Sequence, residues 1–176
     1  PDYEKSVEPL RNATLHDLKK SERPHFRILF LSHGTLEKGV LDAVLAIRRL
    51  LETCDSQWCF AVTFAGGLSE DVAIRFEKEV EELERLGGER MTIKLLGYVS
   101  GNEKRRCYLE HDIFLSPSRW ESFGLTVLEA MAFGMRIVAA ASDGVQGVLP
   151  PAYPYLAPVS NPVDLSENLP NKKEDQ

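Results

Sequence analysis

The chain has 176 residues, 43% of them hydrophobic, which is enough to bury one substantial core and fits a single domain of ordinary size. Its formal net charge of -6 argues against a nucleic-acid partner or a membrane surface, because such partners favour a basic face. The 3 cysteines, Cys54, Cys59 and Cys107, lack the paired spacing of metal ligands, so we expect buried thiols rather than a zinc site or a disulfide framework.

Both ends of the chain are polar. Residues 1–25 lack a long apolar periodicity and are predicted to be a linker, with one or two helical turns over residues 14–20. Residues 171–176 are expected to be a flexible tail. No apolar run approaches the roughly 18 residues that span a bilayer, and the first residues lack a signal-peptide pattern. We therefore expect a cytoplasmic location.

Short apolar runs alternate with helical patterns along the rest of the chain, as is typical of parallel strands covered on both faces. Strands are predicted at residues 28–31, 58–65, 92–96, 112–116 and 137–141, with helices between them at residues 41–51, 69–86, 100–109 and 125–133. The expected helix caps are Ser69 and a capping box of Ser100 and Glu103. A loop after residue 141, a short strand at 155–157 and a small helix at 161–169 complete the chain.

Five strands alternating with four helices predict an α/β fold, a single Rossmann-like three-layer domain with a mainly parallel sheet over residues 26–170. Ligands bind such folds outside the carboxyl ends of the strands. Ser122, Phe123 and Gly124 form a turn at one such end, and its free N–H groups and helix dipole suit a phosphate.

Two acids flank this turn. Glu129 lies on the small-residue face of the helix, where its carboxylate needs donors such as ribose hydroxyls. The spacing also fits a first-turn acid at Glu121 and an ordinary exposed residue at Glu129.

The run PSRWESFGLTVLEAMAFG, residues 117–134, resembles the E-x7-E motif of the family 4 (group 1) retaining glycosyltransferases, which have the GT-B fold. The resemblance extends over about residues 28–169. It implies the C-terminal, donor-binding half of such an enzyme, without the acceptor domain, and residues 1–25 would be the interdomain connection or its remnant. The backbone around the donor's pyrophosphate and sugar would be that of Ser122, Phe123, Gly124 and Leu125.

The resemblance also assigns roles to charged side chains. Glu129 would hold the ribose hydroxyls. Glu121 would face the donor sugar, orient it and stabilise positive charge at the anomeric carbon. Lys38, in the run LEKG, would stabilise the departing diphosphate. Lys38 and Glu121 are therefore the predicted catalytic residues.

The loop of Lys38 also contains His33 and Gly34, which the resemblance places against the donor phosphates. His33 stands where the family has an arginine, and a histidine is only partly charged near neutral pH, so phosphate binding there would depend on pH. Alternatively, His33 is a neutral hydrogen-bonding loop residue and Lys38 a surface lysine.

The segment of Tyr98 and Val99 resembles the part of the family that borders the nucleotide base, with backbone groups reading the base edge. Tyr98 could instead only pack the loop. The resemblance requires neither a metal nor a cofactor, and we interpret the acidic run at residues 77–84 as a solvated helix face.

The implied function is donor binding in a glycosyltransferase of the hexosyltransferase type, with a UDP- or GDP-linked sugar as donor. The isolated domain would transfer little or no sugar. Any peripheral membrane association would go through the missing half. Two alternatives stay open: a non-catalytic nucleotide-binding or interaction module with the same fold, and a GT-B sugar epimerase. Arg136, where the family usually has proline, and the altered run at residues 140–144 depart from the family pattern.

Overall fold

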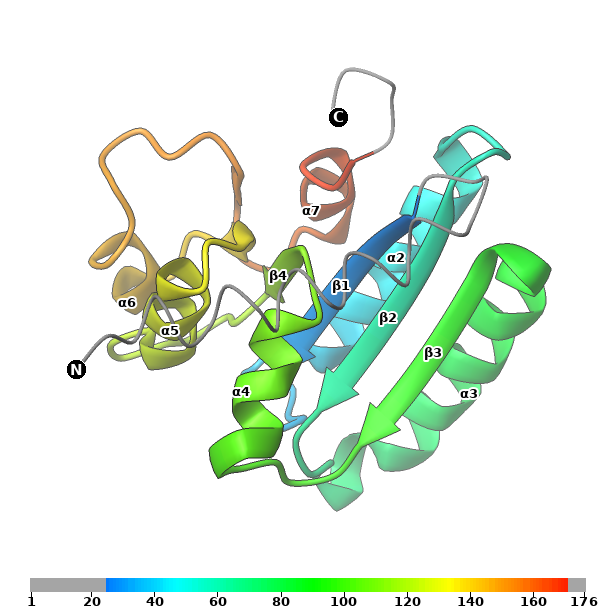
Figure 1. The fold of residues 1–176 in the computed structure, drawn as a ribbon, viewed down its shortest axis with the longest axis horizontal. Helices are drawn as coiled ribbons and strands as arrows, with labels where there is room; N and C mark the ends of the chain where they lie inside the picture. The colour runs from blue at the N-terminus through cyan, green and yellow to red at the C-terminus, as the bar shows by residue number, and fades with distance from the viewer. Residues whose placement is uncertain (1–24, 171–176) are drawn as a thin grey trace.

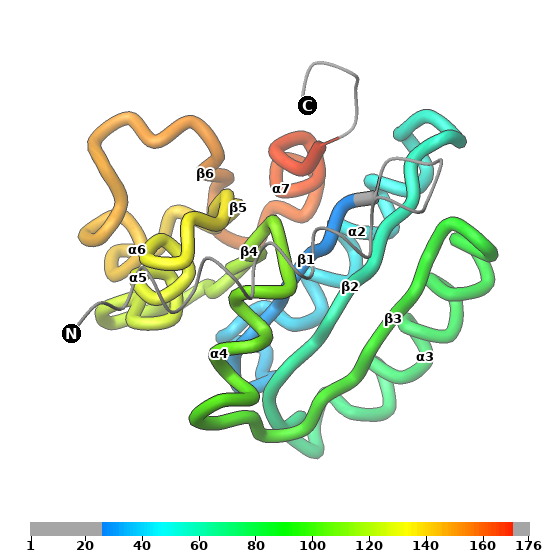
Figure 2. The backbone as a smooth tube through the Cα atoms, in the orientation of Figure 1, coloured from blue at the N-terminus to red at the C-terminus, as the bar shows by residue number. Residues whose placement is uncertain are grey.

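A computed structural model describes residues 25–170. Six parallel strands form one sheet in the order β3-β2-β1-β4-β5-β6. Figure 1 labels β1 to β4. The strands are β1 (His25–Leu31), β2 (Cys59–Ala65), β3 (Met91–Leu96), β4 (Ile113–Ser116), β5 (Arg136–Ala140) and β6 (Leu156–Ala157). Figure 2 shows β5 and β6 continuing the sheet beyond β4.

The helices are α2 (Val40–Thr53), α3 (Glu70–Gly87), α4 (Gly101–Leu109), α5 (Leu125–Ala132), α6 (Asp143–Gln146) and α7 (Pro162–Glu167), with a 3-10 turn, η1 (Gly88–Arg90). Helices α2, α3 and α7 share one core with the sheet, and α4, α5 and α6 share a second core on the other face. Figure 1 shows α4 in front of the sheet and α2 and α3 behind it. The largest fully buried side chains include Trp58, Phe60, Phe76 and Phe114.

The strand order reverses between β1 and β4, because the chain leaves β1 toward β2 and returns to β4 on the other side. These two neighbours pair through Ile28 with Ile113 and Leu29 with Phe114. At the amino end of this β1–β4 seam, the guanidinium of Arg27 donates to both carboxylate oxygens of Asp112, at 2.9 and 2.6 Å. At the other end, the loops after β1 and β4 leave the carboxyl edge of the sheet, where ligands bind in such folds.

The expected α/β fold with a parallel sheet is confirmed, and the described strands are all parallel. The largest difference is α6, which lies in the stretch expected to be a loop. Its four residues are too few for a periodic apolar pattern. The expectations for residues 1–24, including the turns at 14–20, and for the tail at 171–176 lie outside the described residues.

The two predicted helix caps have the expected positions but lack the expected side-chain bonds. Ser69 occupies the N-cap of α3, but its hydroxyl donates to the carbonyl of Gly34 at 3.1 Å, because the loop after β1 lies against this helix start. Ser100 occupies the N-cap of α4 without a side-chain capping bond to any described residue. Gly101 follows it with φ of 51°, so the first turn lacks the geometry of a capping box.

The three cysteines are free thiols; Cys59 and Cys107 are buried and Cys54 is half-buried.

Candidate active site

A lysine and a glutamate from different loops meet at the carboxyl edge of the sheet. The ammonium of Lys38 donates to a carboxylate oxygen of Glu121 at 2.7 Å. Lys38 follows β1 and Glu121 follows β4, so the pair joins the two loops where the strand order reverses. Both side chains are half-buried. The structure thus brings together the two residues predicted to be catalytic.

The pair has its geometry because the two loops are tied to each other. The N–H of Arg119 donates to the carbonyl of Glu37 at 2.7 Å. The guanidinium of Arg119 also contacts both oxygens of Asp42 in α2, at 2.9 and 3.0 Å. Gly39 makes the approach possible, because a Cβ there would collide with the carbonyl of Pro117. A lysine and a glutamate 83 residues apart are thereby held within one hydrogen bond.

The charge of Glu121 is stabilised where it lies. Burial alone would raise the pKa of its carboxyl, but the Lys38 ammonium and the backbone N–H groups of Gly124 and Phe123 outweigh burial and lower the pKa below its usual value. Glu121 is therefore a carboxylate at neutral pH. The N–H groups that were expected to receive a phosphate thus also support this carboxylate.

Gly124 is the N-cap of α5 and has φ of 73°, a conformation that favours glycine. The turn it forms is supported by α6. The N–H of Gly144 donates to the carbonyl of Glu121 at 2.9 Å, and a Cβ on Gly144 would overlap that same oxygen. Phe123 and Leu125 are exposed beside the turn, as is Ser122, so the surface around the start of α5 is open to a ligand.

Glu129, one turn further along α5, has protein donors of its own. The hydroxyl of Tyr108 donates to Oε2 of Glu129 at 2.6 Å, and the ammonium of Lys104 contacts Oε1 at 2.9 Å and Oε2 at 2.6 Å. Both donors come from α4. The Glu129 side chain is still 42% exposed, so the carboxylate remains accessible from solvent.

A cavity of about 400 Å³ opens between the ends of β1, β2 and β3; we call it the polar cavity after the His, Tyr, Ser and Lys side chains among its lining residues. His33, Tyr98 and Val99 line it, so three residues predicted to bind the donor come together here. Lys104 lines the same cavity and connects it to Glu129. The other lining residues are Leu31, Ser32, Ala65, Gly66, Gly67, Ser100 and Gly101.

Gly34 has a structural role in the described region. Its N–H donates to the carbonyl of Gly67 at 2.8 Å, and its carbonyl accepts from the N–H of Ser69 at 3.0 Å. A Cβ on Gly34 would also crowd Leu68. These bonds tie the loop after β1 to the loop after β2, and both backbone polar groups of Gly34 are bonded within the protein.

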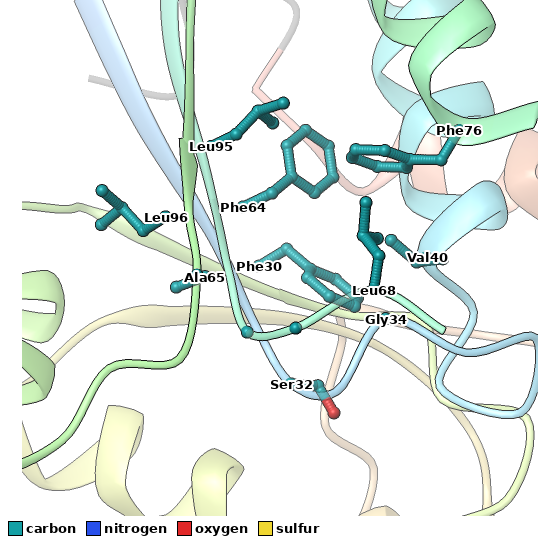
Figure 3. Close-up of a pocket in the computed structure, with 13 residues that line it drawn as sticks. Phe30, Ser32, Gly34, Val40, Phe64, Ala65, Leu68, Phe76, Leu95 and Leu96 are labelled. Carbon is teal, nitrogen blue, oxygen red and sulfur yellow. The ribbon is translucent and has the colours of Figure 1, made fainter. Parts of the chain in front are cut away.

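A second, apolar pocket of about 190 Å³ lies next to the polar cavity. The side chains of Phe30, Phe64 and Phe76 converge on it together with Leu68 (Figure 3). The two pockets share four lining residues, which are Ser32, Ala65, Gly66 and Gly67.

Within residues 25–170 there is no group of three or more His, Cys, Asp or Glu side chains placed to hold a metal ion. The helices of that same region include none long and apolar enough to cross a membrane.

Most of the chain matches one known protein family. The family described as "Glycosyl transferases group 1" matches residues 15–176. The chain belongs to this family. A relative from the cps region of Klebsiella pneumoniae, a 41.2 kDa protein, is 27% identical to this group 1 chain over 156 residues. The match covers 84% of this chain and 38% of the Klebsiella protein, so the chain spans less than half of that relative.

Solved structures agree with the family. The C-terminal domain of a group 1 glycosyltransferase, LpcC of Francisella tularensis, has a TM-score of 0.67 at 19% identity, covering 89% of this chain and 78% of that domain. Anabaena HepE, in complex with UDP and glucose, has a TM-score of 0.68 at 20% identity, covering 90% of this chain and 41% of HepE. The expected fold, one half of a GT-B glycosyltransferase, is confirmed.

Several residues of this group 1 domain that build the site were not found from the sequence. Asp42 and Arg119 look like ordinary surface residues of a helix and a loop, and Gly144 lies in a segment without periodicity. Tyr108 fits the apolar side of α4, so its contact with Glu129 carried no separate signal. Lys104 lies four residues before Tyr108, which puts both side chains on one face of a helix. This spacing is the signal in the sequence that the two could share a partner.

Proposed function

We propose that the chain is the donor-binding domain of a retaining glycosyltransferase, which moves a sugar from a nucleotide-diphosphate sugar to an acceptor. The observation that carries the proposal is the Lys38–Glu121 pair, held at the carboxyl end of the β1–β4 seam beside the start of α5. A cation and a carboxylate side by side suit a reaction in which a diphosphate departs and positive charge develops on the sugar.

Each member of the pair has one task. Lys38 and the N–H groups at the start of α5 stabilise the negative charge of the departing diphosphate. Glu121 orients the donor sugar and stabilises positive charge at the anomeric carbon. The Lys38 ammonium and the Glu121 carboxylate neutralise each other. Donor binding divides the pair, with the lysine on the phosphate and the carboxylate on the sugar.

The nucleoside part of the donor lies in the polar cavity. Tyr98 and Val99 border the base with backbone groups and apolar atoms, and His33 lies on the phosphate side. Glu129 accepts the ribose hydroxyls, since a carboxylate is an acceptor that matches a diol. UDP is the first nucleotide to test, because HepE was solved with UDP and glucose.

The acceptor is bound by a second domain. The chain spans 38% of the Klebsiella relative and 41% of HepE, which leaves room for another domain in a complete enzyme. The GT-B fold places its active site between two such domains, so the isolated donor domain binds nucleotide sugar and turns it over slowly or not at all.

A thermal-unfolding screen tests donor binding. A nucleotide at 100 times its Kd adds about 2.7 kcal/mol to the stability of the folded domain, which raises the midpoint by several degrees at this size. UDP, GDP and ADP are compared on the unchanged chain, on Lys38→Met and on the matched control Lys78→Met, an exposed lysine of α3. We expect one nucleotide to raise the midpoint, and the rise to shrink in Lys38→Met only.

Two results would count against the proposal. An absence of any rise at millimolar nucleotide would favour the non-catalytic interaction module with the same fold. A rise that Lys38→Met and Lys78→Met retain equally would place the nucleotide away from the Lys38–Glu121 pair.

A further inference from the structure

Glu129 is held by two donors that differ in how firmly they are fixed. Tyr108 is 3% exposed, and its ring stacks on Phe133 with centroids 5.2 Å apart and packs against Phe114 at 6.0 Å. Phe133 directly follows α5, the helix that carries Glu129. The Tyr108 ring therefore packs between α4 and the end of α5, and its hydroxyl points toward the carboxylate of Glu129.

The phenol stays a donor at all ordinary pH values. Burial, and then the hydrogen bond to Glu129, raise the pKa of Tyr108 far above its usual value. The hydroxyl approaches one oxygen, Oε2 of Glu129, from the protein side.

Lys104 is attached differently. Its side chain is 30% exposed, lines the polar cavity and is a flexible chain of four methylene groups. Its ammonium contacts both oxygens of Glu129, which places it between them. A vicinal diol that donates one hydrogen bond to each oxygen needs this same position. A ribose and the Lys104 ammonium therefore compete for the carboxylate, whereas the Tyr108 hydroxyl competes with neither.

We propose that Tyr108 is a positioning residue that fixes the carboxylate of Glu129 for a ribose diol, and that Lys104 is an exchangeable counterion which the diol displaces. The inference rests on the proposed function, because it takes the ligand of Glu129 to be the ribose of the donor. It adds that the ribose subsite is built from α4 as well as from α5.

The test is a ratio of dissociation constants, Kd for 2′,3′-dideoxy-UDP divided by Kd for UDP, measured by titration calorimetry. The ratio isolates the diol, because changes in phosphate attraction alter both constants equally. GDP or ADP and their dideoxy forms replace this pair if the thermal screen selects another base. For the unchanged chain we expect a ratio of about 10 or more, since hydrogen bonds to a charged group are strong.

Tyr108→Phe removes one hydroxyl and keeps the ring packing, and we expect it to lower the ratio at least 3-fold. Lys104→Met removes the competitor, and we expect the ratio to rise, by up to about 5-fold for a pair this exposed. Tyr153→Phe is the matched control. Its hydroxyl donates to the carbonyl of Ile137 at 3.1 Å, away from Glu129, so the ratio should stay unchanged.

Three outcomes would overturn the inference. In the first, Tyr108→Phe keeps the ratio of the unchanged chain. In the second, Lys104→Met lowers the ratio as Tyr108→Phe does, which would make the lysine a fixed part of the subsite. In the third, Glu129→Gln keeps a high ratio, so the diol binds elsewhere. A chain that binds none of the three nucleotides would instead refute the proposed function itself, and the inference with it.

Discussion

Replacing Arg119 with methionine leaves the carboxylate of Asp42 without its partner. The Asp42 side chain is 6% exposed, whereas Arg119 is 41% exposed, so the unpaired aspartate bears most of the cost. Removing one partner of a fully buried pair costs about 3–5 kcal/mol, and a hydrogen bond to a charged group is worth about 1.5–3 kcal/mol. Because Arg119 is partly solvated, we expect a loss of about 2 kcal/mol.

The measurement is urea unfolding of four proteins: the unchanged chain, Arg119→Met, Asp42→Ala and the double variant. The two residues contact each other, so the double variant should lose less than the sum of the single variants, by about 1–2 kcal/mol. Arg49→Met is the matched control, since Arg49 pairs with Glu52 at 3.8 Å on the exposed side of α2. We expect less than about 0.5 kcal/mol from that exposed pair.

Additive losses in the cycle would refute this reasoning, as would equal losses in Arg119→Met and Arg49→Met. Either result would mean that the backbone bond from Arg119 to Glu37 holds the two loops together without the ion pair.

Three further predictions concern the site and its supports. Burial, together with the nearby charge of Arg27, lowers the pKa of His111. The neutral imidazole therefore contributes stability above about pH 6.5, and this contribution is lost as the pH falls. His111→Gln should flatten the fall in urea midpoint between pH 7 and pH 5. Glu121→Gln removes a negative charge beside Lys38, and calorimetry should show about 2- to 5-fold tighter UDP binding. Gly144→Ala would press a methyl group against the Glu121 carbonyl and should cost about 1–3 kcal/mol in urea unfolding, unlike the control Gly147→Ala, where a Cβ makes ordinary contact.

Each of these has a contrary result. An unchanged pH slope in His111→Gln would mean that other groups cause the acid sensitivity. Weaker UDP binding in Glu121→Gln would show that the carboxylate positions Lys38 rather than competing with the phosphate. Equal stability of the two alanine variants would mean that α6 yields to the added methyl group.

The elements of the sheet could be predicted because each has a local cause. The run at residues 28–31 is apolar throughout, as a strand covered on both faces requires, and α2 and α3 show the period of amphipathic helices. Glu121 and Glu129 likewise lie within one short stretch, so the amino-acid sequence by itself locates both acids.

The contacts that shape the site have no such local cause. Arg119 and Asp42 are 77 residues apart, and their pairing depends on two loops that meet only once the sheet is formed. Ser69 is of a residue type that often caps helices, but its hydroxyl donates to the carbonyl of Gly34 in the loop after β1. Tyr108 and Lys104 could be placed on one face of α4, while their common partner on α5 follows from how the two helices pack.

The contacts at the two ends of the β1–β4 seam oppose the local separation of β1 from β4. The seam is closed at its amino end by Arg27 and Asp112, and at its carboxyl end by the contacts of Lys38 and Arg119. The seam separates β3-β2-β1 from β4-β5-β6 in the strand order. A ligand that contacts the loops after both β1 and β4 adds reversible contacts across the carboxyl end of the seam. Amide hydrogen exchange in the residues of β1 and β4 that flank the seam should therefore slow when nucleotide is bound.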